Sequence, residues 1–481
     1  MKKKYLSIIA AISLLTGLVA GCTPDSTPST TTTETSSKSQ DYDVVVVGGG
    51  AAGLTAAITA AEEGAKVALL EKLSFVGGST MLSGGIVYGV NSEIHKSAGV
   101  EDSPEDLASY WSERAQGKND LDVLRFVAEH SGETMDWIVE RGVKFGEPYP
   151  TGTSPVKRAV STDNGGAGII KPLKEHAESK GVEFFLETPV KELIIVDGVV
   201  TGVKAIQKDG QEKVFNAKSV ILTTGGFDHN EDLMKEYASR SLNHHSFASS
   251  GNTGDGLLMA SDAGAQVISN GGTIGFRRVK DEPSYTTPVS SLMWMPYLYV
   301  NSNGERFVNE TIDYPIFYEE LIKQPEQIGY LVFDANTYVE TLDDAVEKGV
   351  AFKSETLADL AQAMGVDPAT FESTVENYNA MIAGGEDTAF GKDLTDHKPI
   401  DSPAYYALVV EPAILGTMSG IKTNLDAEVL NGDDEPIKGL YAAGEIANGS
   451  FFNLEYPASG TSIQMSLTFG RIAGSKAAAN K

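Results

Sequence analysis

The segment Val44–Gly53 constrains the fold of this chain more than any other. Four valines precede a glycine-rich turn, Gly48-x-Gly50-x-x-Gly53, and a run of small residues suited to a helix follows. A second apolar run then ends at Glu71. A strand, a glycine turn, a helix, a second strand and an acid within about 30 residues are typical of a dinucleotide-binding unit. The sequence therefore predicts an α/β fold built on a parallel sheet.

Each of these positions has a physical reason. Gly48 permits the tight turn, and Gly50 lets backbone N–H groups approach a pyrophosphate at the helix N-terminus. Gly53 lets the helix pack closely on the strand. Glu71 is expected to accept hydrogen bonds from an adenosine ribose, and its charge would repel a 2′-phosphate.

The N-terminal residues predict export rather than fold. Lys2, Lys3 and Lys4 precede an apolar stretch too short to favour a permanent membrane span, and Ala20-Gly21-Cys22 resembles a bacterial lipoprotein cleavage site. We expect residues 1–22 to be a lipoprotein signal with Cys22 acylated, and residues 23–40 to be a flexible Ser/Thr-rich linker. The predicted location is the extracytoplasmic face of the cell membrane, with a lipid anchor.

Composition excludes several function classes. The formal net charge of −28 argues against nucleic acid as a partner. Cys22 is the single cysteine, so the chain has no disulfide framework, no iron–sulfur ligand set and no Cys-x-x-Cys-His haem attachment, and we predict no metal site. Redox chemistry in this chain would need an organic cofactor and a separate electron partner.

The remaining chain divides into three stretches. Residues 41–271 and 412–481 are expected to form one dinucleotide-binding domain, and residues 272–411, with a different composition, an inserted domain. The pattern predicts helices within 103–141, a strand series over 182–215, a buried strand ending in the glycines at 225–226, and a final helix over about 460–479.

Four further motifs complete a resemblance to a known family. They are residues 223–227 (TTGGF), 252–256 (NTGDG), 303–310 (NGERFVNE) and 439–445 (GLYAAGE). With the 48–71 unit, they make residues 41–481 similar to the fumarate reductase and succinate dehydrogenase flavoprotein superfamily. The resemblance implies a Rossmann-like FAD-binding domain with an inserted α+β capping domain that closes on a small-molecule substrate above the flavin.

The resemblance also implies which residues bind FAD. Lys72, Gly78, Ser79 and Thr80 fall where the family holds the phosphates and the flavin edge, and the N-terminus of the last helix would stabilise negative charge on the reduced flavin. No histidine occurs between Glu71 and Val90, so FAD is expected to be noncovalent. The full expected set is Gly48, Gly50, Ala52, Gly53, Glu71, Lys72, Gly78, Ser79, Thr80, Gly84, Gly85, Val190, Thr224, Gly225, Asp255, Gly444, Glu445, Ser459, Ser462 and Ile463.

The substrate motifs depart from those of fumarate reductases. Their proton-donating arginine is replaced by Tyr314, residues 415–420 lack their histidine, and residues 455–460 lack their late arginine. Two carboxylates need cations or strong donors, so this pattern disfavours fumarate.

The replacements are instead similar to the 3-ketosteroid dehydrogenases. That branch implies that Tyr456 and the Gly460 N–H bind a ketone oxygen, and that Tyr314 moves a proton at the neighbouring carbon. A phenol and an amide suit an enolate-like oxygen, and a tyrosine suits a weak carbon acid. We therefore expect catalysis by Tyr314, Tyr456 and Gly460 on a C=C or CH–CH bond next to a carbonyl, as an ene-reductase or a dehydrogenase of a 3-ketosteroid-like or other enone substrate.

Two alternatives stay open. Arg277 and Arg278 fall near a substrate-contacting position of the fumarate reductases, and they would bind one carboxylate of a urocanate-, cinnamate- or fumarate-like acid. The chain would otherwise be a non-catalytic flavin electron carrier. In every case the expected electron partner is a separate flavin or quinone carrier, and the sequence does not fix the direction of the reaction.

Overall fold

Strand β1 (Gln40–Val47) lies inside the main sheet of the computed structural model, which describes residues 40–481. The expected signal, Cys22 and nearly all of the linker lie outside the described residues. β1 pairs in parallel with β2 (Val67–Leu70) on one side and β8 (Glu212–Leu222) on the other. The sheet order is β17-β18-β8-β1-β2-β5, with the β6–β7 hairpin attached to β8. The remaining strands are β5 (Glu183–Phe185), β6 (Val190–Val196), β7 (Val199–Ile206), β17 (Glu428–Leu430) and β18 (Pro436–Ala442).

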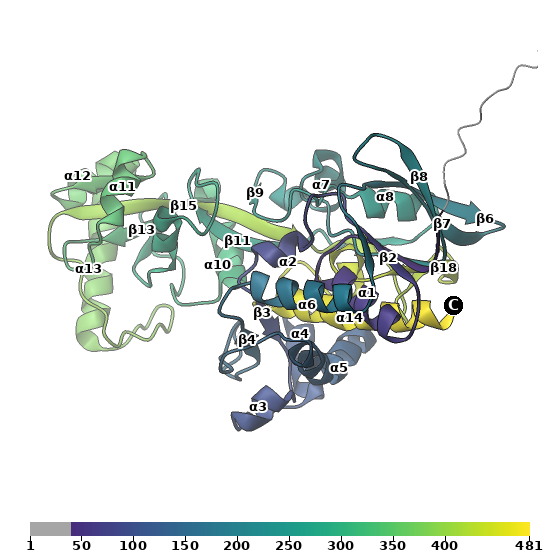
Figure 1. Cartoon of the computed structure of the whole chain (residues 1–481). Helices are drawn as coiled ribbons and strands as arrows, with labels where there is room; N and C mark the ends of the chain where they lie inside the picture. Colours follow the sequence, from purple (N-terminus) through teal and green to yellow (C-terminus); the bar gives the residue numbers. More distant parts are fainter. Residues whose placement is uncertain (1–39) are drawn as a thin grey trace, which may run out of the picture. The chain divides into compact units, whose positions relative to one another are not determined.

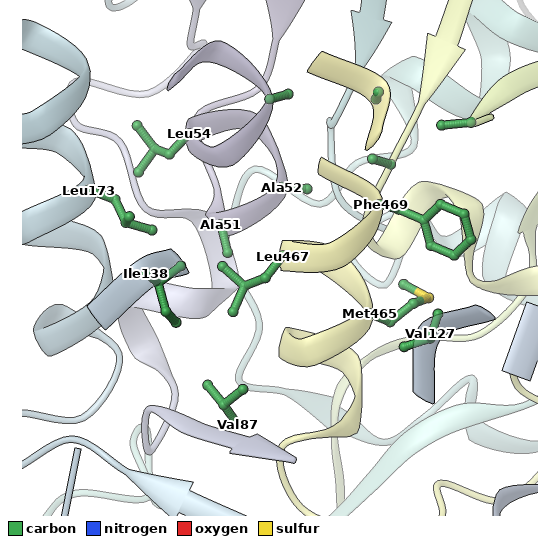
Figure 2. Close-up of a cluster of buried hydrophobic side chains, with 14 of the residues drawn as sticks. Ala51, Ala52, Leu54, Val87, Val127, Ile138, Leu173, Met465, Leu467 and Phe469 are labelled. Atoms are coloured by element: carbon green, nitrogen blue, oxygen red, sulfur yellow. The ribbon is translucent and has the colours of Figure 1, made fainter. Parts of the chain in front are cut away.

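Helices α1 (Ala51–Glu62) and α14 (Thr461–Ala479) pack closely together against this sheet, although they lie far apart in the sequence (Figure 1). Small residues make this possible, because a Cβ at Gly474 would lie 2.3 Å from the carbonyl oxygen of Ala56. Figure 2 shows Ala51 of α1 beside Leu467 of α14 at this contact. α5 (Leu121–Glu140) and α6 (Ala167–Ser179) complete the same core.

The inserted part contains its own antiparallel sheet, with strand order β11-β15-β13-β12. Its long strand β15 (Tyr405–Thr417) also pairs with β14 and with β9, which precedes the insertion in the chain (Figure 1). The other strands are β9 (His245–Ser246), β11 (Thr273–Val279), β12 (Tyr299–Asn301), β13 (Gly329–Phe333) and β14 (Ala351–Ser354). The helices of this part are α9 (Pro288–Ser291), α10 (Tyr314–Leu321), α11 (Thr341–Glu347), α12 (Leu357–Met364) and α13 (Pro368–Gly384).

The remaining helices and strand pairs lie outside the two main sheets. They are α2 (Gly78–Leu82), α3 (Glu93–Ser97), α4 (Pro104–Arg114), α7 (Glu231–Tyr237), α8 (Asp255–Asp262), and the strand pairs β3 (Ile86–Tyr88) with β4 (Ala159–Ser161) and β10 (Val267–Ile268) with β16 (Gly420–Ile421). Both parts belong to one compact unit.

The predicted α/β class, the helices within 103–141 and the final helix are confirmed. Ser103 caps α4 by accepting a hydrogen bond from the Asp106 N–H, and Pro104 is the first residue of the helix. The expected boundary at residue 411 falls inside β15, so a single strand belongs to both parts. The chain therefore leaves the insertion along a continuous strand rather than through a loop.

We predict that Gly474→Ala lowers the free energy of unfolding by about 1–3 kcal/mol, because the added methyl overpacks the contact between α14 and α1. Urea denaturation would measure this change in the free energy of unfolding. Gly384→Ala is the matched control, since this exposed helical glycine has no atom within 4 Å of its Cβ position, and its stability should stay equal or rise by up to about 1 kcal/mol. Equal stability of the two variants would contradict the close-packing argument.

Candidate functional site

A cavity of about 450 Å³ opens at the carboxyl ends of the central strands. Val47, Thr223 and Ala443 line it, and they lie at or directly after the ends of β1, β8 and β18. Open α/β sheets bind their ligands at this edge. Residues of the inserted part, including Phe276 and Trp294, form the opposite wall. One cavity therefore joins the expected cofactor site to the expected substrate site.

The glycine turn is shaped to bring a ligand close to the backbone. Gly48 has φ +105°, and a Cβ there would lie 2.3 Å from the carbonyl oxygen of Thr223. Gly50 precedes the first residue of α1, and the nearest atom to its Cβ position is 3.9 Å away. The open space at a helix N-terminus fits a pyrophosphate. Gly53 serves packing, since a Cβ there would lie 2.0 Å from the Gly48 carbonyl oxygen.

Glu71 directly follows β2 and is held against this turn in a fixed orientation. Its Oε2 accepts a hydrogen bond from the Gly49 N–H at 2.9 Å, and its Oε1 accepts one from the Leu73 N–H at 2.8 Å. A carboxylate has about four lone-pair directions, so each oxygen keeps one for a further donor. The side chain is buried yet lines the cavity, which suits the expected contact with ribose hydroxyl groups.

Lys72 and Asp255, both expected at the cofactor, bind each other. The Lys72 Nζ lies 2.7 Å from Asp255 Oδ2 and 2.6 Å from the Thr253 hydroxyl. Asp255 is the first residue of α8, and both ionic side chains line the cavity. The ammonium group is therefore already neutralised by a carboxylate.

Glu445 lies in a narrow slot beside Asp228. A Cβ at Gly226 would lie 2.1 Å from Glu445 Oε1, and one at Gly416 2.6 Å from it. Asn252 donates to Asp228 Oδ1 at 3.0 Å and to Glu445 Oε2 at 3.1 Å. Burial and the neighbouring Asp228 raise the pKa of Glu445 to about 8, and burial raises the pKa of Asp228. Glu445 is therefore protonated at neutral pH.

The structure brings most of the expected cofactor residues to this cavity. The exceptions are Gly53 and Gly85, which support its wall from behind: a Cβ at Gly85 would lie 2.3 Å from the Gly165 carbonyl oxygen. The expected residues that line it are Gly48, Gly50, Ala52, Glu71, Lys72, Gly78, Ser79, Thr80, Gly84, Val190, Thr224, Gly225, Asp255, Gly444, Glu445, Ser459, Ser462 and Ile463.

Neither candidate arginine lines the cavity. The Arg278 Nε lies 2.6 Å from Glu411 Oε1 in an ion pair. Arg277 is buried, with its guanidinium 4.2 Å from the centre of the Phe317 ring, and its Nε and Nη1 have no hydrogen-bond partner. Strand β11 turns Phe276, rather than either arginine, toward the cavity. No arginine is present among the described residues that form the cavity wall.

The two expected catalytic tyrosines reach the cavity from opposite parts. Tyr314 opens α10 of the inserted part, and Tyr456 comes from the loop before α14. The Tyr456 hydroxyl accepts a hydrogen bond from the Ser462 N–H at 2.8 Å, which leaves its own proton for another acceptor. Burial raises the pKa of both phenols, so both are protonated at neutral pH.

Aromatic rings enclose the end of the cavity in the inserted part. Phe276 makes edge-to-face contacts with Tyr314, Tyr285 and Trp294, with ring centres 5.0, 5.5 and 5.6 Å apart. Phe247 joins the group through Tyr285, at 5.4 Å. All five rings line the cavity, and Trp294 keeps 44% of its surface exposed. This end suits a flat apolar ligand.

Sequence reasoning missed several residues of the site. Asn252 belongs to the motif at residues 252–256, but that motif does not reveal the role of its amide. Asp313 directly precedes Tyr314, and the pattern Asp-x-Pro is a helix-start signal that could have indicated it. Phe247, Phe276 and Tyr285 carry no local signal, because aromatic residues are frequent in any core.

Known proteins match most of the chain. A family model described as an FAD binding domain matches residues 43–463. The urocanate reductase of Eggerthella lenta is 33% identical over 462 residues, covering 91% of this chain and 75% of that protein. The structure of the open conformation of a flavocytochrome c3 fumarate reductase is 30% identical, with a TM-score of 0.75 and coverage of 92% of this chain and 78% of that one.

A second solved structure represents the steroid branch. The 3-ketosteroid-delta4-(5alpha)-dehydrogenase from Rhodococcus jostii RHA1, in complex with 4-androstene-3,17-dione, is also 30% identical. Its TM-score is 0.76, and the match covers 94% of this chain and 99% of that one. The resemblance expected from the motifs, to the fumarate reductases and to the 3-ketosteroid dehydrogenases, is confirmed.

We predict that folding stability falls as pH rises from about 4.5 to about 8, in part because of Glu445. The folded state holds a proton that the unfolded carboxyl loses near its ordinary pKa, so this stabilisation is complete below that value and is lost as pH rises through the raised pKa. Melting temperatures of Glu445→Gln should vary less over this window than those of the parent protein. Asp433→Asn, at an exposed turn, is the control. Parallel curves for the parent protein and Glu445→Gln would contradict the assignment.

Proposed function

The chain belongs to the FAD binding domain family, and from that premise we propose that it reduces a carbon–carbon double bond conjugated to a carbonyl group in a flat, apolar substrate. The chain is an FAD-dependent oxidoreductase of the fumarate reductase family, acting on CH–CH and C=C bonds. The proposed substrate class depends on the residues that face the cavity.

The fit of the chain to FAD supports a noncovalent cofactor. The open turn at Gly50, the oriented carboxylate of Glu71 and the position of the cavity at the strand ends match a dinucleotide site. The cavity wall formed by the described residues contains no histidine that would attach the flavin. When bound, FAD would exchange hydride with the substrate, and the protein would bind, orient and protonate that substrate.

The observation that carries the proposal is the pair of protonated phenols in one cavity. Tyr456 has a hydroxyl proton free for a carbonyl oxygen, and the amide groups at the N-terminus of α14 face that hydroxyl. The negative charge that develops on an enolate oxygen would be stabilised there. Tyr314, from the other wall, would then donate a proton to the α-carbon. Donation of this proton would complete the reduction of the double bond.

The charges of the cavity support an uncharged substrate. Lys72 is the only cation among the described residues that line it, and that ammonium group already pairs with Asp255. Arg278 is paired with Glu411, and Arg277 does not reach the cavity. A substrate carboxylate would therefore be desolvated without a partner, which is unfavourable. This argues against the unsaturated-acid alternative.

We also propose the cellular setting expected from the N-terminal residues. The lysines and apolar stretch before Cys22 support a lipid anchor on the extracytoplasmic face of the membrane. With one cysteine in the chain, electrons would reach the flavin from a separate flavin or quinone carrier.

An acceptor panel tests the substrate class. We predict that photoreduced protein, kept anaerobic, is reoxidised rapidly by 4-phenyl-3-buten-2-one or a 3-keto-4-ene steroid, and slowly by urocanate, cinnamate or fumarate. Stopped-flow absorbance of the flavin is the measurement. The opposite order would support the carboxylate alternative, and reoxidation by none of these acceptors would support the electron-carrier alternative.

We predict that Tyr456→Phe lowers turnover of the enone by about 10²–10³-fold, because one oxyanion donor is lost, while flavin content stays unchanged. Tyr314→Phe should lower it by about 10²–10⁴-fold through loss of the general acid. Tyr441→Phe is the matched control, since this buried hydroxyl contacts Asn480 and lies outside the cavity wall. Unchanged turnover in Tyr456→Phe would refute its role.

A further inference from the structure

Asp313 lies at the junction between the two walls of the cavity. It caps α10, and its Oδ1 accepts a hydrogen bond from the Tyr314 N–H at 2.9 Å. The other donors come from across the junction. The Ser459 hydroxyl donates to Oδ1 at 2.7 Å, and the N–H groups of Ser459 and Gly152 donate to Oδ2 at 3.0 and 2.9 Å. The carboxylate also lines the cavity.

We propose that Asp313 is a positioning and specificity-determining residue, which fixes Tyr314 opposite Tyr456 and excludes carboxylate-bearing substrates from the aromatic end of the cavity. The positioning role rests on the proposed function of the two tyrosines. The exclusion of anions depends only on the position of the Asp313 carboxylate in the cavity wall.

The positioning role follows from the short series of hydrogen bonds that links the two phenols. Asp313 binds the backbone of Tyr314 on one side and both donors of Ser459 on the other. Ser459 belongs to the same short loop as Tyr456, whose hydroxyl contacts the first turn of α14. One carboxylate therefore sets the separation of the proton donor and the oxyanion donor. A misplacement of about 1 Å in such a pair costs about 10²-fold in rate.

The charge of Asp313 acts on its surroundings as well. Burial is the main cause that raises the pKa of Tyr314, and Tyr456, Asp313 and Tyr285 add to it, while Ser459 opposes it. Burial lowers the pKa of the neighbouring Arg277, and the charges of Tyr299 and Asp313 oppose that shift. No ion pair joins Asp313 to a lysine or arginine in the described part of the chain, so its charge is met by neutral donors.

This arrangement explains why an anion is disfavoured at the aromatic end. Asp313 is the carboxylate that the inserted part contributes to the cavity wall. A second carboxylate beside it would meet like charge in a poorly solvated space, which costs affinity. An uncharged carbonyl compound would not meet this repulsion.

Asp313→Asn tests both roles, because it keeps the shape of the side chain, removes the charge and places an amide where two acceptor oxygens stood. We expect enone turnover to fall about 10–100-fold with flavin content unchanged. The basic limb of the pH–rate profile should move to lower pH, because removal of a negative charge lowers the pKa of Tyr314. Cinnamate should inhibit the variant at about tenfold lower concentration than the parent protein.

Two controls separate this role from helix capping. Asp367→Asn changes an aspartate that also caps a helix of the inserted part before a proline, and it should alter none of these readouts. Ser459→Ala removes one hydrogen bond and leaves the charge, so it should lower turnover without improving inhibition by cinnamate. The proposal would be overturned if Asp313→Asn only lowered stability and left both the pH–rate profile and the inhibition by cinnamate unchanged.

The role of Asp313 can be tested even if the proposed function is wrong. If the parent protein reacts with no enone, hydrogen exchange of residues 313–321 and cinnamate binding measured by flavin absorbance still report on Asp313. Faster exchange and tighter cinnamate binding in Asp313→Asn would support the inference without any turnover. No difference from the parent protein in either measurement would overturn it.

Discussion

The approach of the glycine turn to Thr223 is the contact on which the site depends. Only a residue without a Cβ fits at Gly48, where the backbone lies against β8, or at Gly53, where α1 meets the turn. This contact directs the N-terminus of α1 and the carboxyl ends of the central strands to one edge of the sheet. The cavity, the orientation of Glu71 and the place of any dinucleotide follow from it.

The inserted part completes the cavity with a different chemistry. The FAD-binding part contributes backbone amides and a few charged groups, whereas the inserted part contributes aromatic rings and the carboxylate of Asp313. Strand β15 joins the two parts by continuous backbone, and the hydrogen bonds of Asp313 to Ser459 and Gly152 fix their junction near the reacting groups. In the proposed function, the apolar wall would accept a flat ligand, and the phenols of Tyr314 and Tyr456 would supply its polar contacts.

Charged groups in this protein are compensated in two ways. The ion pair of Lys72 with Asp255 and that of Arg278 with Glu411 neutralise cations that would otherwise attract anions. Glu445 lies beside Asp228, no ion pair joins it to a lysine or arginine among residues 40–481, and it keeps a proton instead. The electrostatic character of the cavity is thus set by which cations are already paired, and a count of charges in the sequence would not give it.

The sequence by itself determined the dinucleotide unit and the family, and it predicted most of the residues that line the cavity at the strand ends, because glycine turns and strand ends are local features with a fixed spacing. It also indicated Tyr314 and Tyr456, through their motifs, as candidates for catalysis. Only the tertiary structure decided that Arg277 lies behind the wall while Phe276 faces the cavity, since neighbouring residues of a strand point to opposite sides and the sequence does not say which side is open. It likewise brought Asp313 to Ser459, because hydrogen bonds between segments more than a hundred residues apart exist only once the chain has folded.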